Sequence, residues 1–178
     1  MTAFALHSHP LTPCAFIDAV AVAIQTLPHS AMRYVYEVRG DIRQLDIPGA
    51  RLPVRTNDLW RQTCFEAFLR EPGTSVYDEF NFAPSGEWAA YRFEHYRSGM
   101  VELELGSMPA IACHQSHDLL RVEVLVGSSE CTAPALQLGL SAVLRDRTGT
   151  ISYWALRHAP GKPDFHHDHA FVGRIDIA

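Results

Sequence analysis

The 178-residue chain has almost no lysine, and it contains no basic cluster and no long apolar run. Lys162 is the single lysine, and the fifteen Lys and Arg residues are outnumbered by twenty Asp and Glu. Nucleic-acid binding relies on clustered cations that replace the counterions of phosphates, so we expect no nucleic-acid partner. A membrane helix needs about 20 consecutive apolar residues, so we expect no membrane partner either.

The four cysteines, Cys14, Cys64, Cys113 and Cys131, include no C-x-x-C pair. Their spacing excludes zinc knuckles and thioredoxin-like redox motifs. Isolated cysteines in a chain long enough to form its own core are expected to be reduced, buried and apolar in character. Residues 1–13 have neither a basic start nor a continuous apolar stretch, so they do not match a signal peptide, and we expect a cytoplasmic location.

The motifs of common catalytic sites are also absent. The chain has no G-x-S-x-G elbow, P-loop, G-x-G-x-x-G or H-E-x-x-H. Glycoside hydrolysis needs two carboxyl groups that face each other at a set separation. Asp78 and Glu79 are adjacent, and on one strand they point to opposite faces. We therefore expect a binding domain more than an enzyme.

What the sequence does contain is an apolar residue at nearly every second position, which is typical of β-strands. The length fits one domain, which we expect to span residues 1–178. Ala15–Ile24 resembles a short helix, but its alternation and β-branched residues favour a strand. The predicted strands are near Val20–Ile24 and at Met32–Val38, Thr63–Leu69, Val76–Phe82, Trp88–Phe93, Leu120–Val126, Leu136–Leu144, Ile151–Leu156 and Phe171–Ile177.

Turn residues separate these strands at short intervals. Pro72-Gly73, Pro84-Ser85-Gly86 and Asp146–Thr150 each fit a tight connection between neighbouring strands. Many short strands with frequent turns predict an all-β fold, an antiparallel β-sandwich of immunoglobulin-like or jelly-roll type. Asp41–Asn57 is the longest irregular stretch, and a loop of that length in a small domain is often functional.

Two predicted strands each carry a glutamate on one face. Glu66 shares its face with Cys64 and Phe68, and Glu79 shares its face with Tyr77 and Asn81. If these faces line a concave pocket, the two carboxylates form an acceptor pair for sugar hydroxyls or a cation. The alternative is a solvated sheet surface with no ligand.

Aromatic side chains supply a second kind of candidate. Exposed Trp and Tyr rings can stack on a sugar ring or on haem, although most aromatic residues on strands belong to the core. Trp60 and Trp154 are better candidates than Trp88, because they neighbour polar loop segments.

The segment His158–His169 contains four histidines, two aspartates and the only lysine. Imidazoles and carboxylates bind zinc or copper, so His166, His167 and His169, with Asp164, form one candidate metal set. A second alternative is haem ligation by His158 or His166 with a methionine. A third is a polar loop whose histidines bond to backbone groups.

Three segments together resemble a known family: Asp58–Phe68, Glu79–Tyr91, and Ser152–Leu156 followed by Pro160–His167. From about Phe4 to Ile177 the chain is similar to bacterial DOMON-like domains, relatives of the family-nine carbohydrate-binding modules. This resemblance implies a β-sandwich that binds haem or a sugar on one sheet. It also implies that two tryptophans hold the end of a saccharide, with Trp60 and Trp154 in those places. Haem-binding members use a methionine with a histidine or lysine as iron ligands, and the sequence shows no matching pair of these residues.

We therefore expect a non-catalytic domain for a small carbohydrate, a sugar nucleotide or another sugar-derived ligand. The alternatives are a haem-binding domain, a metal-dependent enzyme and a protein-interaction domain. The predicted ligand-binding residues are Trp60, Arg61, Glu66, Asn81, Trp88, Arg92, Trp154, His158, Lys162, Asp164 and His166.

Overall fold

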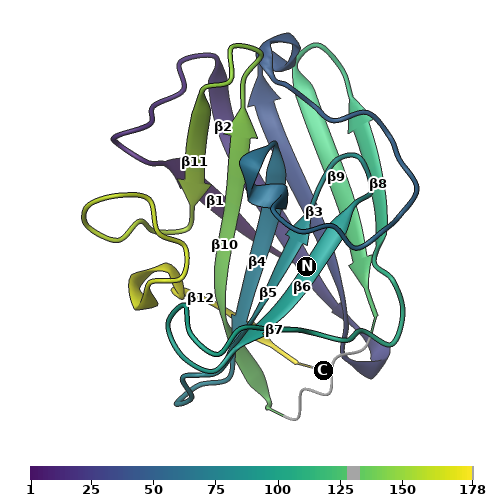
Figure 1. Cartoon of the computed structure of the whole chain (residues 1–178), viewed down its shortest axis with the longest axis vertical. Coiled ribbons are helices and arrows are strands. Elements are labelled where there is room, and N and C mark those ends of the chain that lie inside the picture. The colour runs from purple at the N-terminus through teal and green to yellow at the C-terminus, as the bar shows by residue number, and fades with distance from the viewer. Residues whose placement is uncertain (128–132, 178) are drawn as a thin grey trace.

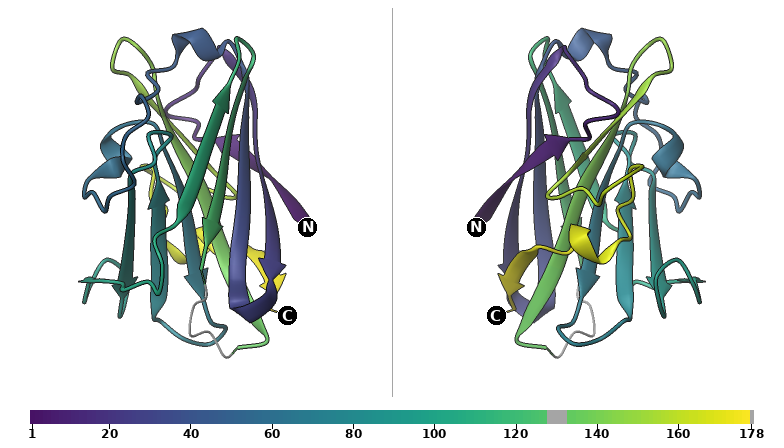
Figure 2. Two further views of the ribbon diagram at one scale, coloured as in Figure 1. Left: turned by 90° about the vertical axis from the view of Figure 1, so that its right-hand side faces the viewer. Right: turned by 90° about the vertical axis from the view of Figure 1, so that its left-hand side faces the viewer.

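The computed structural model describes residues 1–127 and 133–177, which form two layers of antiparallel strands (Figures 1 and 2). The back sheet has the order β1-β2-β3-β9-β8, and the front sheet has the order β7-β6-β5-β4-β10-β11, with β12 also paired to β10. The back sheet contains β1 Thr2–Ser8, β2 Ile17–Leu27, β3 Ala31–Gly40, β8 Ala110–Gln115 and β9 Leu119–Val126. The front sheet contains β4 Cys64–Arg70, β5 Tyr77–Phe82, β6 Trp88–Phe93, β7 Val101–Glu102, β10 Ala135–Arg145, β11 Ile151–Ala155 and β12 Gly173–Asp176.

These strands confirm the predicted all-β sandwich and every strand expected from the alternation. Within Ala15–Ile24 the strand, β2, begins at Ile17. Three strands were missed: β1, β7 and β8. Strand β7 has only two residues, and β8 is an edge strand with two partly buried apolar side chains, Ile111 and Cys113. A strand that buries so little has a weak apolar rhythm. The helical content is limited to four 3₁₀ turns in the described residues: η1 Pro28–Ser30, η2 Ile42–Gln44, η3 Leu59–Arg61 and η4 Asp168–Ala170.

The main core lies between the two sheets. Strand β3 contributes alternate residues such as Tyr34, Tyr36 and Val38, and β4 contributes Phe65 and Ala67 in the same way. The hydroxyl of Tyr36 donates a hydrogen bond across the core to the carbonyl oxygen of Glu66 at 3.0 Å. This bond satisfies a buried phenol and joins the two layers.

Strand β1 belongs to both layers. Residues 2–6 pair with β2 in the back sheet, and His7 and Ser8 pair with β11 in the front sheet. One side of the sandwich is therefore closed by hydrogen bonds. The opposite side ends in two edge strands, β7 and β8.

A second, smaller apolar cluster lies on the outer face of the front sheet. It joins Phe68, Tyr77 and Phe93 to Phe165 and Phe171 of the C-terminal segment. The C-terminal segment packs over this face, so both faces of the front sheet are partly buried. This arrangement explains why β4 is buried at six consecutive positions and not only at alternate ones.

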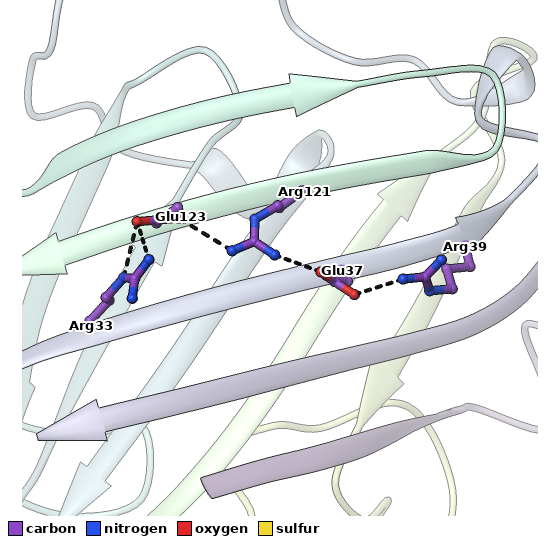
Figure 3. A network of polar contacts seen from close by, with 5 residues as sticks. All are labelled: Arg33, Glu37, Arg39, Arg121 and Glu123. Atoms are coloured by element: carbon purple, nitrogen blue, oxygen red, sulfur yellow. Dashed lines mark hydrogen bonds and ion pairs between the residues drawn. The ribbon is translucent and has the colours of Figure 1, made fainter. Parts of the chain in front are cut away.

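The outer face of the back sheet has a different character. Five charged side chains of β3 and β9 form a chain of ion pairs in which the sign alternates (Figure 3): Arg33, Glu123, Arg121, Glu37 and Arg39. Since neighbouring charges on this face already pair with one another, it remains a solvated surface with little unbalanced charge.

The described cysteines carry no disulfide. Cys64 is buried, as expected, whereas Cys14 and Cys113 are only half-buried. Cys131 lies outside the described residues. No helix in residues 1–127 and 133–177 has the length and apolar character needed to cross a bilayer.

Gly40 ends β3 in a conformation with φ of 142°, a region that side chains with a Cβ rarely adopt. A Cβ at this position would overlap the carbonyl oxygen of Phe16. We expect Gly40→Ala to lower the free energy of unfolding by about 1–3 kcal/mol, measured by urea denaturation. The matched control is Gly49→Ala, because nothing lies within 4 Å of a Cβ there and it should be neutral or slightly stabilising. Equal stability of the two variants would contradict this prediction.

Candidate functional site

A cavity of about 950 Å³ lies on the outer face of the front sheet. Strands β4, β5, β6, β10 and β11 form its floor, and three further segments form its walls: residues 57–60, which include part of η3, residues 97–102, which include β7, and residues 162–166. In Figure 1 the short helix η3 lies over one end of β4, and the yellow C-terminal loop lies beside β10 and β11. The cavity therefore occupies the part of this face that the C-terminal segment leaves open.

The strand register brings the polar floor residues together. Glu66 of β4 is paired with Asn81 of β5 on one side and with Ser141 of β10 on the other. In the next row Glu79 of β5 is paired with Tyr91 of β6. Directly paired residues point to the same face of a sheet. The four polar residues and Tyr91 therefore all point to the outer face, away from the main core.

The floor is polar but nearly closed to solvent. Glu66 and Glu79 are only 3% and 7% exposed. The hydroxyl of Ser141 donates to Oε2 of Glu66 at 3.0 Å, and the amide nitrogen of Asn81 donates to Oε1 of Glu79 at 2.7 Å. These bonds fix the two carboxyl groups in place. The floor is thus a rigid row of oxygen atoms.

Burial changes the acidity of both glutamates. Loss of solvent, with the nearby charge of Glu79, raises the pKa of Glu66 to about 8. Burial likewise raises the pKa of Glu79, although the Asn81 hydrogen bond and Arg97 oppose this effect. Because the pKa of Glu66 lies above 7, the pair retains a proton at neutral pH, and its total charge is close to −1.

His166 closes one side of the floor through a chain of hydrogen bonds. The backbone N–H of Arg97 donates to the hydroxyl oxygen of Tyr77, and that hydroxyl lies 2.8 Å from Nδ1 of His166. The other ring nitrogen, Nε2, lies 3.7 Å from Oε2 of Glu79. Burial and the charge of Arg97 lower the pKa of His166 to about 4, so the ring is neutral at pH 7 and its contact with Glu79 is not an ion pair.

The mouth of the cavity carries an exposed indole. Trp60 is 48% exposed on η3, and the guanidinium of Arg61 lies 5.1 Å from the centre of its ring. Asp58, the residue before η3, has φ of 62°, and this conformation turns the chain into η3. Its carboxylate pairs with the guanidinium of Arg61 at 3.5 Å. Short polar side chains such as aspartate tolerate this left-handed conformation. The turn presents Trp60 at the edge of the cavity.

Aromatic rings also form the cavity walls. Tyr91 donates a hydrogen bond to Oδ1 of Asn57 at 2.6 Å, which ties β6 to the η3 loop. Tyr153 of β11 packs edge-on against Phe165 of the C-terminal loop, with ring centres 5.9 Å apart. The cavity thus combines a polar floor with apolar, aromatic sides.

The structure brings five of the predicted residues to this cavity: Trp60, Glu66, Asn81, Lys162 and His166. Two others are one contact away. Arg61 covers the ring of Trp60, and Asp164 pairs with Arg97, which lines the cavity, at 2.9 Å. The paired glutamates therefore do occur on one concave face, as the alternation indicated.

Four predicted residues do not lie on the cavity. Trp88 and Trp154 are 5% and 6% exposed and point into the main core on the opposite side of the front sheet. The indole N–H of Trp154 donates to Ser152, and that of Trp88 has no hydrogen-bond partner among the described residues. Arg92 binds Asp78 through two nitrogens, and Nε2 of His158 contacts the carbonyl of His7 at 2.7 Å.

Several lining residues were missing from the predicted set, including Tyr91, Tyr153, Phe93, Phe165, Arg97 and Glu79. The strand parity contained the signal for two of them. Residues 88 and 91 are three positions apart on one strand, so their side chains point to opposite faces, and the same holds for the adjacent residues 153 and 154. The strand register places Tyr91 and Tyr153 on the face that carries Glu79, so the two tryptophans face the other way.

The predicted histidine set does not form a metal site. Nδ1 of His167 accepts a hydrogen bond from the backbone N–H of His169, and the two rings pack against each other, whereas His166 faces the cavity. No group of three His, Cys, Asp or Glu side chains in residues 1–127 and 133–177 is arranged to hold a metal ion.

Haem ligation by the predicted histidines fits the structure poorly. Met100 and His166 both line the cavity, but Nδ1 of His166 is bonded to Tyr77 and Nε2 faces the carboxylate of Glu79. A metal bonded to an imidazole nitrogen lies about 2 Å from it, in space next to that carboxylate. His158 does not line the cavity.

Comparisons with known proteins show which folds are similar. No protein-family model and no curated protein matches the chain. A candidate carbohydrate-binding protein from Bacteroides uniformis matches with a TM-score of 0.66 and 12% identity, over 100% of this chain and 87% of that chain. A family-nine carbohydrate-binding module from Caldicellulosiruptor kristjanssonii matches in its glucose and cellotriose complexes, each with a TM-score of 0.52 and 13% identity. These two matches cover 90% and 89% of this chain, and 76% and 74% of the other. The fold is therefore a β-sandwich like that of the family-nine modules.

Proposed function

We propose that this domain binds a small carbohydrate in the front-sheet cavity and does not alter it chemically. The observation that carries the proposal is the buried row of Glu66, Asn81 and Glu79 beneath aromatic walls and the exposed ring of Trp60. A cavity of about 950 Å³ is at the large end of the usual range for small-molecule sites. Such a volume admits one or two sugar rings.

The two kinds of surface in this cavity match the two kinds of surface on a sugar ring. The C–H face of a pyranose is apolar and packs on a flat aromatic ring such as that of Trp60, Tyr91 or Tyr153. The hydroxyl groups at its edge need hydrogen-bond acceptors, which the carboxyl groups of Glu66 and Glu79 supply. A fold shared with a module solved in complex with glucose and cellotriose supports the same proposal.

The geometry favours binding without hydrolysis. Glycosidase carboxyl groups flank the scissile bond from different sides. Glu66 and Glu79 instead point up from one sheet surface, in diagonal positions on neighbouring strands. Both also accept hydrogen bonds from neighbouring side chains. A sugar on this floor meets both carboxyl groups on the same side.

We include in this proposal a DOMON-like relationship for the chain. Two of the segments that resemble those domains, Glu79–Tyr91 and Pro160–His167, supply lining residues of the cavity, among them Glu79, Tyr91 and His166. Shared sequence features that meet at one cavity are better explained by a common binding mode than by packing alone.

The test is calorimetric titration of the wild-type domain with neutral and amino monosaccharides and with β-linked disaccharides. We expect binding to at least one of them, and a loss of affinity of about 30-fold in Trp60→Ala, because a well-placed tryptophan contributes about 2 kcal/mol to binding. Leu52→Ala is the control, since Leu52 is 85% exposed and does not line the cavity. Absence of binding to every sugar, or full affinity in Trp60→Ala, would overturn the proposal.

A further inference from the structure

Most of the hydrogen-bond donors at the cavity floor already point to acceptors within the protein. The hydroxyl hydrogen of Ser141 goes to Glu66, and the amide of Asn81 gives a hydrogen to Glu79. The hydroxyl of Tyr77 is hydrogen-bonded to His166, and the hydroxyl hydrogen of Tyr91 goes to Asn57 at the wall. What remains for a ligand at the floor is therefore mainly acceptor capacity.

One acceptor is especially open. Among the described residues, Oε1 of Glu66 has no hydrogen-bond partner, although the side chain is almost completely buried and lines the cavity. Oε2 of Glu79 has only the neutral His166 ring nearby, at 3.7 Å. Within the part of the chain that the structure describes, Nε1 of Trp88 is the one fully buried side-chain nitrogen or oxygen that lacks a partner, so the free oxygen of Glu66 is accessible from the cavity, where a ligand can donate to it.

The positive charges near the floor do not balance the two glutamates. The guanidinium of Arg97 pairs with Asp164 at 2.9 Å, so its charge is already compensated. Lys162 is exposed at the outer wall, above the floor and not on it. The floor therefore attracts a cation and repels an anion.

We propose that the carbohydrate this cavity selects carries a free, protonated amine, as in a 2-amino sugar, and that the ammonium group donates to Glu66 and Glu79. This inference rests on the sugar-binding function proposed above and specifies its ligand class. An ammonium group offers three donors and no acceptor, together with a positive charge. It therefore matches a floor of acceptors with unbalanced negative charge better than a neutral hydroxyl does.

The same chemistry excludes two close relatives of the ligand. Acetylation of the amine removes its charge and two of its three donor hydrogens, and it adds a carbonyl oxygen beside the carboxyl oxygens of Glu66 and Glu79. A uronic acid brings a carboxylate to the two glutamates and is repelled. Sugar nucleotides, which are anionic, are disfavoured for the same reason. Binding of the amine also displaces the proton that Glu66 and Glu79 share, so protons are released into the buffer.

The experiment is calorimetry at pH 7 with glucosamine, galactosamine and mannosamine, each compared with its neutral parent and its N-acetyl form. We expect at least one amine to bind ten-fold or more tightly than its parent, with proton release seen as a difference between Tris and phosphate buffers. Glu66→Gln and Glu79→Gln keep the side-chain shape but remove the charge, so each should reduce that preference to less than three-fold. Glu104→Gln makes the same change at an exposed glutamate that does not line the cavity and should keep the preference.

The outcomes separate this inference from the function on which it rests. A neutral or N-acetylated sugar that binds as tightly as the matching amine overturns the amine preference and leaves sugar binding intact. Absence of binding to every sugar overturns both. Circular dichroism and thermal melting of the two Gln variants establish that they are folded. If a folded Gln variant retains the full amine preference, the glutamates are not its source and the inference is wrong.

Discussion

Trp154→Ala is expected to destabilise the domain by about 3–5 kcal/mol, while Trp60→Ala changes the free energy of unfolding by less than about 0.5 kcal/mol. Trp154 is 6% exposed and packs in the main core, and its indole N–H is bonded to Ser152. Its removal leaves a large void that the two sheets cannot close. Trp60 is 48% exposed at the cavity mouth and buries little in the free protein.

Urea denaturation of the three proteins measures both effects, and sugar titration of the same samples completes the comparison. We expect a clean separation, in which one tryptophan determines stability and the other determines affinity. Equal destabilisation by the two substitutions would show that the indole of Trp60 is part of the folded core and is not poised for a ligand.

Glu66→Gln is expected to change the dependence of stability on pH. The pKa of Glu66 is about 8 in the folded protein, above its ordinary value of 4.5. The folded state therefore holds a proton that the unfolded state releases, and the stability this group contributes below pH 4.5 is lost as the pH rises toward 8. Glutamine cannot ionise, so the variant escapes this loss.

The measurable quantity is the unfolding free energy of the variant minus that of the wild type. We expect it to rise by on the order of 3 kcal/mol between pH 5 and pH 8.5, since a pKa difference of one corresponds to about 1.4 kcal/mol. The pKa of His166 is lowered in the folded protein, so this residue reduces the stability of the fold below pH 6.5. Both proteins contain His166, and its effect largely cancels in the difference between their unfolding free energies. Glu104→Gln, the same change at an exposed residue, is the matched control. A flat difference for Glu66→Gln would mean that Glu66 ionises freely in the fold.

Much of the sandwich was predictable because burial on alternate positions leaves a direct trace in the sequence. The common face of Glu66 and Cys64 and that of Glu79 and Asn81 followed from period two alone. Their meeting on one floor required the pairing of β4 with β5, which the tight Pro72-Gly73 connection makes the simplest choice. These local signals were sufficient for the polar centre of the site.

The positions of the tryptophans could not be predicted from the alternation of apolar residues. Parity shows that Trp88 and Tyr91 face opposite sides, but it does not say which side is the main core. The front sheet is covered on both faces, by the back sheet on one and by the C-terminal segment on the other. Large aromatic residues therefore occur on both, and nearness to polar loops was a poor guide to exposure.

The loop contributions were beyond sequence reasoning for a related reason. Arg97 and Phe165 belong to segments without a periodic pattern, and their place at the cavity depends on tertiary contacts. Arg97 reaches it through Asp164 of the C-terminal loop and Tyr77 of β5. Such contacts join residues 67 and 20 positions apart and leave no mark on either segment alone.

The hydrogen bond between Ser141 and Glu66 joins residues 75 positions apart, and it lies at the centre of the cavity floor. No short stretch of this chain can build the floor by itself, because its neighbouring strands β4 and β10 come from distant parts of the sequence. The chain loses the entropy of closing so long a loop before the contacts between β4 and β10 stabilise it. Folding of such topologies is therefore slow, on the scale of about milliseconds to seconds. Affinity for a ligand should consequently emerge late during refolding, together with the final stable state, and a stopped-flow binding signal would report completion of the whole sheet.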